Sequence, residues 1–439
     1  MTQTVFDSIV IGGGSAGMAF ATSAAKLGAR ILMVERAELG GTCVNRGCVP
    51  KKILWSAGQI ARATRAAASQ DIATQAAIDY QKLIAKRDAH IAGIRDIYAG
   101  NLGDAGVTLL RGEATLNDAH SVNVDGTTYR ADQIILASGG RPAKMDIPGA
   151  ELLSNSNNVL AWTTRPDRIT IIGGGYIGCE FAAIFHALGS DVTLVHNGPH
   201  LLETFPKDLA LHVQNGLATS GIRIQTDDGV SAIKRAGTSL GYTCASGLTD
   251  TAVAVVAAAG RTPNIDQLGP FAETLDTAES GALAISDRFE TSLPGVYTIG
   301  DVADRLPLTP VATADGTALA HMLHGNGAKA ADLDLVATTT FVYPPAAFVG
   351  ETGDAALRCG KLTPLAQNVL SNADRDEAFY QINTKNDILT GAAIAAHGAE
   401  DIIAMAAALI AAKSQASALT KATPVHPSFA EEFFSEREK

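Results

Sequence analysis

Two cysteines, Cys43 and Cys48, have four residues between them in the stretch Gly-Gly-Thr-Cys-Val-Asn-Arg-Gly-Cys-Val-Pro-Lys-Lys at 40–52. We expect the chain to become helical after Pro50, which would bring the two sulfurs close enough to form a disulfide. A dithiol near a helix start and beside two lysines should have at least one thiol with a lowered pKa, as disulfide exchange requires. The pair is therefore a candidate redox centre.

A metal site is the alternative use of two cysteines at this spacing. Such a site needs a second pair of ligands, but Cys179, Cys244 and Cys359 are scattered singly. Cys179 falls inside an apolar helical segment, where a small buried thiol is expected. We therefore expect no metal and favour redox chemistry.

A glycine-rich turn precedes the cysteines. Residues 8–11 form a short apolar run that leads into Gly-Gly-Gly-Ser-Ala-Gly at 12–17, a helical segment and a second strand at 30–35. In such a turn the first glycine makes the bend, the second lets the backbone approach a pyrophosphate, and the third lets helix and strand pack closely. The N-terminus of the helix supplies the positive end of a dipole to the phosphates.

The same design recurs later in the chain. Residues 168–172 lead into Gly-Gly-Gly-Tyr-Ile-Gly at 173–178, then a helical segment to 188 and a strand at 191–196. The two turns lie 161 residues apart (173 − 12). This repetition in the same strand–helix context predicts two nucleotide-binding domains.

The residue at the end of the second strand tests each copy, because a carboxylate there accepts a hydrogen bond from a ribose hydroxyl. Glu35 stands 23 residues after Gly12 (35 − 12) and meets this requirement. The same offset from Gly173 gives His196, followed by Asn197. A histidine neither excludes a 2′-phosphate as a carboxylate would nor grips it as an arginine does. The second site is thus undecided between NADH and NADPH.

Three further apolar runs, at 133–137, 252–259 and 296–299, are expected to be strands that end in glycine-containing turns. From about residue 338 the pattern changes to alternating strands and one amphipathic helix at 400–413. We expect an α/β protein with two Rossmann-like dinucleotide-binding domains and a C-terminal α+β domain. The expected boundaries are 1–150 for the first nucleotide domain, 151–257 for the second, 258–335 for a return to the first, and 336–439 for the C-terminal domain.

The composition describes a globular protein with 46% hydrophobic and 18% charged residues. Its formal charge of −11 argues against nucleic acid or an anionic membrane surface as partner. No apolar run approaches the roughly 20 residues of a membrane span, and the N-terminus does not resemble a secretory signal. Five cysteines are too few and too uneven for a secreted disulfide scaffold. We expect a cytoplasmic enzyme.

Taken in order, these motifs resemble the pyridine-nucleotide disulfide oxidoreductase family, and within it the glutathione reductase branch. The resemblance rests on the cysteine stretch at 40–52, both glycine turns, Gly300-Asp301, Leu-Thr-Pro-Val-Ala at 308–312 and His-Pro-Ser at 426–428. It implies reduction of a low-molecular-weight, glutathione-like disulfide by NAD(P)H through FAD and the cysteine pair. It also makes the C-terminal domain a dimerisation domain.

The resemblance assigns cofactor contacts to both nucleotide sites. Glu35 would hold the adenosine ribose of FAD, and Asp301 would contact its ribityl chain. Tyr176 would cover the flavin until the dinucleotide displaces it, and Arg261 would lie near the reduced dinucleotide. The full set expected for FAD is Gly12, Gly14, Ser15, Gly17, Glu35, Gly41, Thr42, Gly139, Asp301 and Thr309. The set expected for NADH or NADPH is Gly173, Gly175, Tyr176, Gly178, His196, Asn197, Gly260 and Arg261.

The resemblance also implies how the pair works. Cys48 would be the thiol next to the flavin, and Cys43 the thiol that attacks the substrate. Lys51 would sit beside the flavin and pair with Glu180. Lys52, in contrast, is expected to be a solvated surface charge.

A thiolate leaving group needs a proton, which calls for an acid with a near-neutral pKa. Alone, His426 would be taken as an exposed or structural histidine. Its Val-His-Pro-Ser setting, with Glu431 five residues on to fix the tautomer, favours a catalytic role. In the family this pair reaches the cysteines of the other subunit, so a homodimer is implied.

The substrate side departs from the glutathione reductase pattern. Two arginines that clamp substrate carboxylates in that branch align with Thr22 and Thr317, whereas Tyr98 matches a substrate-side aromatic. Ser15 is a further candidate contact. The two arginines that usually bind the 2′-phosphate of NADPH align with Asn197 and Glu203. The alternatives are a dihydrolipoamide-dehydrogenase-like NADH enzyme and a redox-sensing flavoprotein, although a sensor would have no need of His426 and Glu431.

Overall fold

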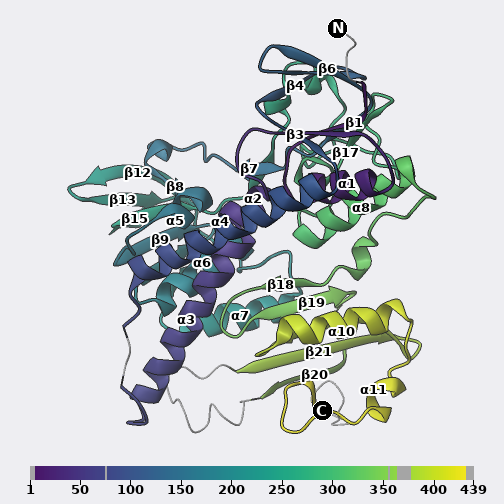
Figure 1. Cartoon of the computed structure of the whole chain (residues 1–439). Coiled ribbons are helices and arrows are strands. Elements are labelled where there is room, and N and C mark those ends of the chain that lie inside the picture. Colours follow the sequence, from purple (N-terminus) through teal and green to yellow (C-terminus); the bar gives the residue numbers. More distant parts are fainter. Residues whose placement is uncertain (1–4, 75–76, 354–355, 363–376, 432–439) are drawn as a thin grey trace. The chain divides into compact units, whose positions relative to one another are not determined.

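The computed structural model describes residues 5–74, 77–353, 356–362 and 377–431 (Figure 1). The chain divides into two compact units. Unit 1 comprises Met1–Lys51, Ala85–Ala143 and Arg261–Leu333; unit 2 comprises Lys52–Ile84, Lys144–Gly260 and Asp334–Lys439. Each unit is thus assembled from three separate segments of chain.

The main sheet of unit 1 is built around β1, the strand that leads into the first glycine turn. Its order is β3-β2-β1-β6-β5-β4, and β17 pairs with β6. β1 runs parallel to β2 and β6, as a strand–helix–strand unit requires, and β4 and β5 add an antiparallel extension. The strands are β1 (Val5–Ile11), β2 (Ile31–Glu35), β3 (Thr108–Arg111), β4 (Ala114–Asp118), β5 (Ser121–Val124), β6 (Thr127–Leu136) and β17 (Val296–Thr298), with a separate pair β7 (Gly140–Pro142) and β16 (Arg261–Pro263).

Both faces of this sheet are buried. Side chains alternate along a strand, so Val10 packs on one side with Phe20 and Leu319, whereas Ile9 and Ile11 belong to a second apolar cluster on the other side. Burial on both faces explains why the parallel strands read as continuous apolar runs. The helices are α1 (Ser15–Lys26), α2 (Gly41–Arg46), α3 (Cys48–Ala68), α4 (Tyr80–Asp104) and α8 (Thr309–His324). Of these, α3 begins in unit 1 and continues into unit 2, whereas α4 begins in unit 2 and continues into unit 1.

Unit 2 contains the second nucleotide-type sheet, of order β11-β10-β9-β15-β8, whose pairings are all parallel. An antiparallel sheet β12-β13-β14 adjoins it in sequence. The elements are β8 (Ser154–Asn155), α5 (Ser156–Ala161), β9 (Arg168–Ile172), α6 (Tyr176–Ala187), β10 (Asp191–Val195), α7 (Lys207–Thr219), β11 (Arg223–Gln225), β12 (Val230–Ala236), β13 (Ser239–Cys244), β14 (Thr249–Ala252) and β15 (Ala254–Ala257).

The C-terminal part of unit 2 is an antiparallel sheet of order β18-β19-β22-β21-β20, with α10 packed on one face (Figure 1). Its elements are β18 (Thr338–Thr340), β19 (Ala346–Gly350), β20 (Ala356–Leu362), β21 (Ala378–Lys385), β22 (Ile388–Ala395), α10 (Ala399–Ala411) and α11 (Ser417–Lys421). The remaining elements among the described residues are short 3₁₀ turns: η1 (Ala150–Leu152), η2 (Asp266–Leu268), η3 (Ala272–Thr274), η4 (Gly300–Val302) and η5 (Leu333–Leu335). Among the described residues, no helix is long and apolar enough to cross a membrane.

The predicted α/β fold class is confirmed, and both strand–glycine turn–helix–strand units are present. The strand predicted at 252–259 is present but shorter. It is β15 (Ala254–Ala257), because Ala252 still belongs to β14 and the chain changes sheet at Val253, which is 53% exposed. β14 pairs with antiparallel β13, and β15 pairs with parallel β9. An uninterrupted apolar run carries no sign of such a change of sheet.

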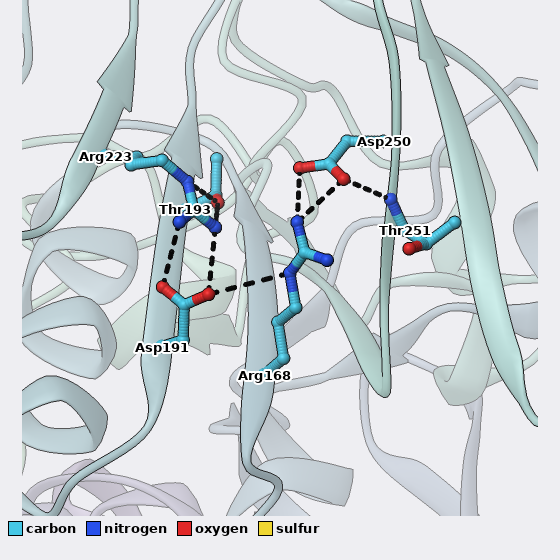
Figure 2. A network of polar contacts seen from close by, with 6 residues as sticks. All are labelled: Arg168, Asp191, Thr193, Arg223, Asp250 and Thr251. Carbon is cyan, nitrogen blue, oxygen red and sulfur yellow. Dashed lines mark hydrogen bonds and ion pairs between the residues drawn. The ribbon is translucent and has the colours of Figure 1, made fainter.

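A network of charged side chains links strands β9, β10, β11 and β14 (Figure 2). Arg168 on β9 donates through Nη2 to both carboxylate oxygens of Asp250, each at 2.7 Å, and its Nε lies 3.6 Å from Asp191. Arg223 donates to the same Asp191 at 3.0 and 3.2 Å. Asp191 thus bridges two arginines, and Arg168 joins β9 to β14.

Replacing Arg168 with alanine is expected to lower the free energy of unfolding by about 1–2 kcal/mol, because it removes two charge-assisted contacts from half-buried groups. Chemical denaturation followed by tryptophan fluorescence measures the change, since both tryptophans, Trp55 and Trp162, lie in the same unit as Arg168. Lys82→Ala is the matched control, since its pair with Asp79 is exposed at both ends and is expected to contribute little to the free energy of unfolding. Equal losses in the two variants would contradict the role of the network.

Candidate active site

At the first glycine turn, β1, α1 and the end of β6 pack so closely that two of the glycines have no room for a Cβ. Gly12 has φ +113°, and a Cβ there would collide with the carbonyl oxygen of Ala137; a Cβ on Gly17 would collide with that of Gly12. Gly14 differs, because the nearest atom its Cβ would meet is the Cα of Gly41, at 3.8 Å. The missing side chain therefore leaves open space at the start of α1, where unpaired N–H groups can bind an anion.

Glu35 lies at the end of β2 and is held by two backbone amides. Its Oε2 accepts from Gly13 N at 2.6 Å, and its Oε1 accepts from Ala37 N at 2.7 Å. The carboxylate is thereby fixed beside the glycine turn. This is the place at which a nucleotide-binding unit recognises a ribose hydroxyl.

The cysteines lie where helices begin. Cys43 is inside α2, and Cys48 is the first residue of α3, so the helix predicted to begin after Pro50, at Lys51, begins three residues earlier (51 − 48). Gly47 ends α2 with φ −152° and separates the two helices. Ser15 and Thr309 begin α1 and α8 and both hydrogen-bond to Cys43. Thr309 Oγ1 also lies 3.5 Å from Cys48 Sγ.

Hydroxyls at two helix N-termini would favour a thiolate at the pair, but other effects dominate at Cys43. The pKa of Cys43 is raised, first by its hydrogen bond with Cys48, then by burial and by the charge of Cys48. The hydroxyls of Thr309 and Ser15 lower it by less. The lowered thiol pKa expected from the sequence is therefore not found at Cys43 in the dithiol state.

Replacing Cys48 with alanine is expected to lower the pKa of Cys43, because the largest cause of its rise is removed. The pH profile of Cys43 alkylation by iodoacetamide should move down by at least about one unit, equivalent to about tenfold faster reaction well below the pKa. Peptide mass spectrometry of the pre-reduced protein measures it.

Thr309→Val is the control of opposite sign, since its hydroxyl lowers the pKa of Cys43 and its loss should raise it. An alkylation profile unchanged by Cys48→Ala would contradict this account of the pair.

Asp301 and Arg261 form a second polar group in unit 1. The carboxylate Oδ2 of Asp301 lies 3.8 Å from Arg261 Nε, and Arg261 Nη2 donates to the carbonyl of Gly140 at 2.6 Å. Burial raises the pKa of Asp301, and Arg261 opposes only part of that rise. A buried carboxylate is costly without strong partners, which suits a group that accepts hydrogen bonds from a bound polyol. Arg261 lies in unit 1, not in the unit of the second glycine turn.

Of the other residues expected at the flavin, Thr42 is exposed and lies in α2 next to Gly41, whereas Gly139 has φ +67° at the end of β6. Gly260, expected at the dinucleotide, has φ +107° after β15. Both glycines therefore adopt a positive φ, a backbone conformation that residues with a side chain rarely adopt.

The second glycine turn repeats the geometry of the first within unit 2. Gly173 has φ +114°, and a Cβ there would collide with the carbonyl of Ala258; one on Gly178 would collide with that of Gly173. A Cβ on Gly175 would meet nothing within 4 Å, so space is open at the start of α6. Tyr176 begins α6 and is 36% exposed. Asn197 is exposed beyond the end of β10.

Glu180 is buried on α6, and its Oε1 accepts from the backbone N–H of Phe341 at 2.9 Å. Lys51 belongs to unit 1 and Glu180 to unit 2, so their pairing stays a prediction.

The expectation that Lys52 is a solvated charge is wrong. Its ammonium lies 2.9 Å from Glu400 Oε1 and 3.9 and 3.8 Å from the ring centres of Trp55 and Phe341. A cation held by a carboxylate and two aromatic faces is part of the packing of α3.

His426 and Glu431 form a dyad near the end of the described chain. His426 Nδ1 lies 2.8 Å from Glu431 Oε2, and Glu431 Oε1 accepts from the N–H of Ser428 at 2.7 Å. A carboxylate partner places the proton on Nδ1, which leaves Nε2 as the outward nitrogen. The histidine side chain is 81% exposed, so Nε2 is open to another molecule.

The candidate substrate residues lie on three helices of unit 1. The hydroxyls of Thr22 and Thr317 donate to carbonyls of their own helices, to Met18 at 2.7 Å and to Thr313 at 3.0 Å. Tyr98 on α4 packs against the apolar cluster that contains Phe20. At these two threonine positions the chain presents no positive charge.

Asn45, between the two cysteines, is a structural residue that the sequence analysis missed. Its amide nitrogen donates to the carbonyls of Leu39 and Gly41, each at 2.9 Å, and its Oδ1 accepts from Arg95 Nε at 2.7 Å. These contacts fix the loop before α2 and tie it to α4. The sequence signal that could have revealed this structural role was the presence of an asparagine between the two cysteines.

Comparison with known proteins agrees with this geometry. Residues 6–316 match the family model of pyridine nucleotide-disulphide oxidoreductases, and residues 336–437 match that family's dimerisation domain. The chain is 34% identical to a glutathione reductase of Nostoc sp. over 98% of its length and 99% of the relative's, and 35% identical to one of Burkholderia cepacia over the whole of both.

Among solved structures, the fold is similar to that of a mutant of an HOCl-induced flavoprotein disulfide reductase of Escherichia coli, solved as a Cu(II) complex. The TM-score is 0.87 at 24% identity, covering 99% of this chain and 98% of the other. Within the described residues, no group of three or more His, Cys, Asp or Glu could hold a metal ion. Since the two family models together span almost the whole sequence, the chain belongs to the pyridine nucleotide-disulphide oxidoreductase family.

Proposed function

We propose that this protein uses NAD(P)H and FAD to reduce a small, glutathione-like disulfide through Cys43 and Cys48. The observation that carries the proposal is the setting of the pair. Both cysteines contact Thr309, and Cys43 also contacts Ser15, the first residue of α1. The N-terminus of α1 thus lies beside both the glycine turn and the dithiol. The full-length similarity to glutathione reductases supports the same activity.

The residues of unit 1 fit a flavin dinucleotide. The space at Gly14 and the start of α1 suit its pyrophosphate, Glu35 suits a ribose, and buried Asp301 suits the hydroxyls of a ribityl chain. Held by these residues, FAD would supply the two-electron chemistry that links the reduced pyridine nucleotide to the Cys43–Cys48 disulfide. The open turn at Gly175, with the start of α6, suits the pyrophosphate of the pyridine nucleotide.

The reduced pair then converts the substrate in two exchanges. Cys43 Sγ, as thiolate, attacks one sulfur of the substrate and forms a mixed disulfide, while the other half leaves as a thiolate that takes a proton. Cys48 Sγ next attacks the sulfur of Cys43, which forms the Cys43–Cys48 bond and releases the second half as a thiol. Two electrons pass from the dithiol to the substrate.

The His426–Glu431 dyad supplies the proton for the leaving thiolate. Glu431 holds the ring through Nδ1, so Nε2 carries the transferred proton. Since residues 336–437 match a dimerisation domain and the imidazole is exposed, we place this dyad at the cysteines of a second copy in a homodimer. The active site is then shared between subunits.

The substrate is expected to carry less negative charge than oxidised glutathione. Thr22 and Thr317 turn their hydroxyls to their own helices and provide no cation for a carboxylate. The loss of a charged hydrogen bond costs about 1.5–3 kcal/mol. An amidated or otherwise neutral relative of glutathione fits these positions better.

Steady-state assays of the purified protein with NADH and NADPH test the proposal. The disulfides would be oxidised glutathione, its diamide, lipoamide and cystine. We expect turnover with at least one small disulfide and a higher kcat/KM for the diamide than for glutathione itself. Bleaching of the flavin by the nucleotide without turnover of any disulfide would refute the reductase function. A preference for lipoamide would favour the dihydrolipoamide dehydrogenase alternative.

A further inference from the structure

The two glycine turns place different residues at one equivalent position. In unit 1, Gly13 N donates to Glu35 Oε2 at 2.6 Å; in unit 2, Gly174 N donates to His196 Nδ1 at 3.2 Å. The donor and the acceptor are 22 residues apart in both cases. His196 therefore stands where a dinucleotide-binding unit contacts the adenosine ribose.

The hydrogen bonds of His196 fix its tautomer. Because Nδ1 accepts from Gly174, the ring proton is on Nε2, and Nε2 lies 2.7 Å from Glu203 Oε1. The histidine is thus neutral in this arrangement, with both ring nitrogens used, and its side chain is only 13% exposed. The neighbouring carboxylate of Glu203 is 48% exposed and faces solvent with its negative charge.

The loop after β10 is shaped for this pair. A Cβ on Gly198 would collide with Glu203 Oε1 and lie 2.8 Å from His196 Nε2, so a side chain at this position would displace the Glu203 carboxylate from the histidine. The turn continues through Leu202, whose φ is +55° and whose N–H donates to the carbonyl of Gly174. This turn brings Glu203 back beside His196 and the glycine turn, although Glu203 lies seven residues after His196 in the sequence.

The segment that follows β10 supplies no positively charged side chain that could bind a phosphate. Between His196 and Pro206 the chain contains neither lysine nor arginine. His200 lies with Nδ1 at 2.8 Å from the carbonyl of Leu201, and Asp228 donates its backbone N–H to the carbonyl of His196. A doubly charged 2′-phosphate would therefore approach a carboxylate, whereas a 2′-hydroxyl would find a hydrogen-bond acceptor.

We propose that the His196–Glu203 pair makes this second site selective for NADH against NADPH. The inference rests on the proposed function, in that it takes this glycine turn to bind the pyridine nucleotide. It assigns to Glu203 a role in specificity, by repulsion of the 2′-phosphate and by fixing the histidine.

Direct binding to the oxidised holoenzyme tests the inference without disulfide turnover. By calorimetry we expect NAD⁺ to bind about 100-fold more tightly than NADP⁺. In Glu203→Arg the preference should fall by at least about 100-fold, chiefly through tighter NADP⁺ binding, because an arginine supplies the fork that a phosphate accepts. Glu203→Gln should give an intermediate ratio.

Glu151→Gln and Glu151→Arg are the matched controls, since they make the same charge changes at an exposed position of unit 2 and should leave the ratio unchanged. NADP⁺ binding as tight as NAD⁺ in the unchanged protein would overturn the selectivity, and so would a ratio that Glu203→Arg does not alter. In either case the reductase function would stand. Failure of both nucleotides to bind would instead refute the nucleotide site itself, and with it the proposed function.

Discussion

Replacing Cys48 with alanine is expected to lower kcat for every disulfide by at least about 1,000-fold, because the second exchange then has no nucleophile. Cys43→Ala should cause a loss of similar size, since the first exchange disappears. The two thiols act in sequence, so the double variant should be no worse than either single one. Steady-state oxidation of the pyridine nucleotide with the preferred disulfide measures all three.

The two single variants separate the roles of the thiols. With Cys48 replaced, a pre-reduced protein should still accept one half of a disulfide on Cys43 and hold it as a mixed disulfide. With Cys43 replaced, little adduct should form on Cys48. Intact mass and peptide mapping distinguish these outcomes, and an adduct that forms only on Cys48 would reverse the order of action. Ser231→Ala is a control, because this exposed serine on β12 lies in neither site.

The parts of the fold that follow from short-range geometry were predictable from sequence. A glycine is required where a Cβ would strike a carbonyl, as at Gly12 against Ala137 and at Gly173 against Ala258. These positions can be recognised in the sequence because the same glycine spacing occurs twice. Glu35 follows by counting from the turn. Both nucleotide-type units could therefore be located from residue order alone.

What depends on long-range packing could not be read in this way. Lys52 looks solvated until Glu400, 348 residues away, comes within 2.9 Å of it. The pKa of Cys43 depends on the burial of the pair and on which hydroxyls face it, not on the nearby lysines. The contact of His196 with Glu203 needs the turn through Leu202, a positive φ that nothing in a leucine suggests.

His426→Ala is expected to lower turnover of an aliphatic disulfide by about 100- to 10,000-fold, the usual contribution of a positioned acid. The loss should depend on the leaving thiol. An aromatic disulfide such as 5,5′-dithiobis(2-nitrobenzoate) releases a thiolate of low pKa that needs no proton, so its reduction should fall by less than about tenfold. Glu431→Ala should give a smaller, parallel loss, because Glu431 positions the imidazole. His90→Ala, an exposed histidine on α4, controls for loss of an imidazole.

Mixing variants tests whether the dyad acts across a dimer interface. If His426 serves the cysteines of a second copy, a heterodimer of Cys48→Ala and His426→Ala chains contains one complete site and one doubly defective site. Co-expression of the two chains should then restore about a quarter of the unchanged activity, because about half of the dimers are mixed and each has one working site. If the dyad served its own chain, both sites of the heterodimer would be defective and no activity would return. Equal losses of aliphatic and aromatic disulfide reduction in His426→Ala would separately show that the residue acts in some way other than by proton donation.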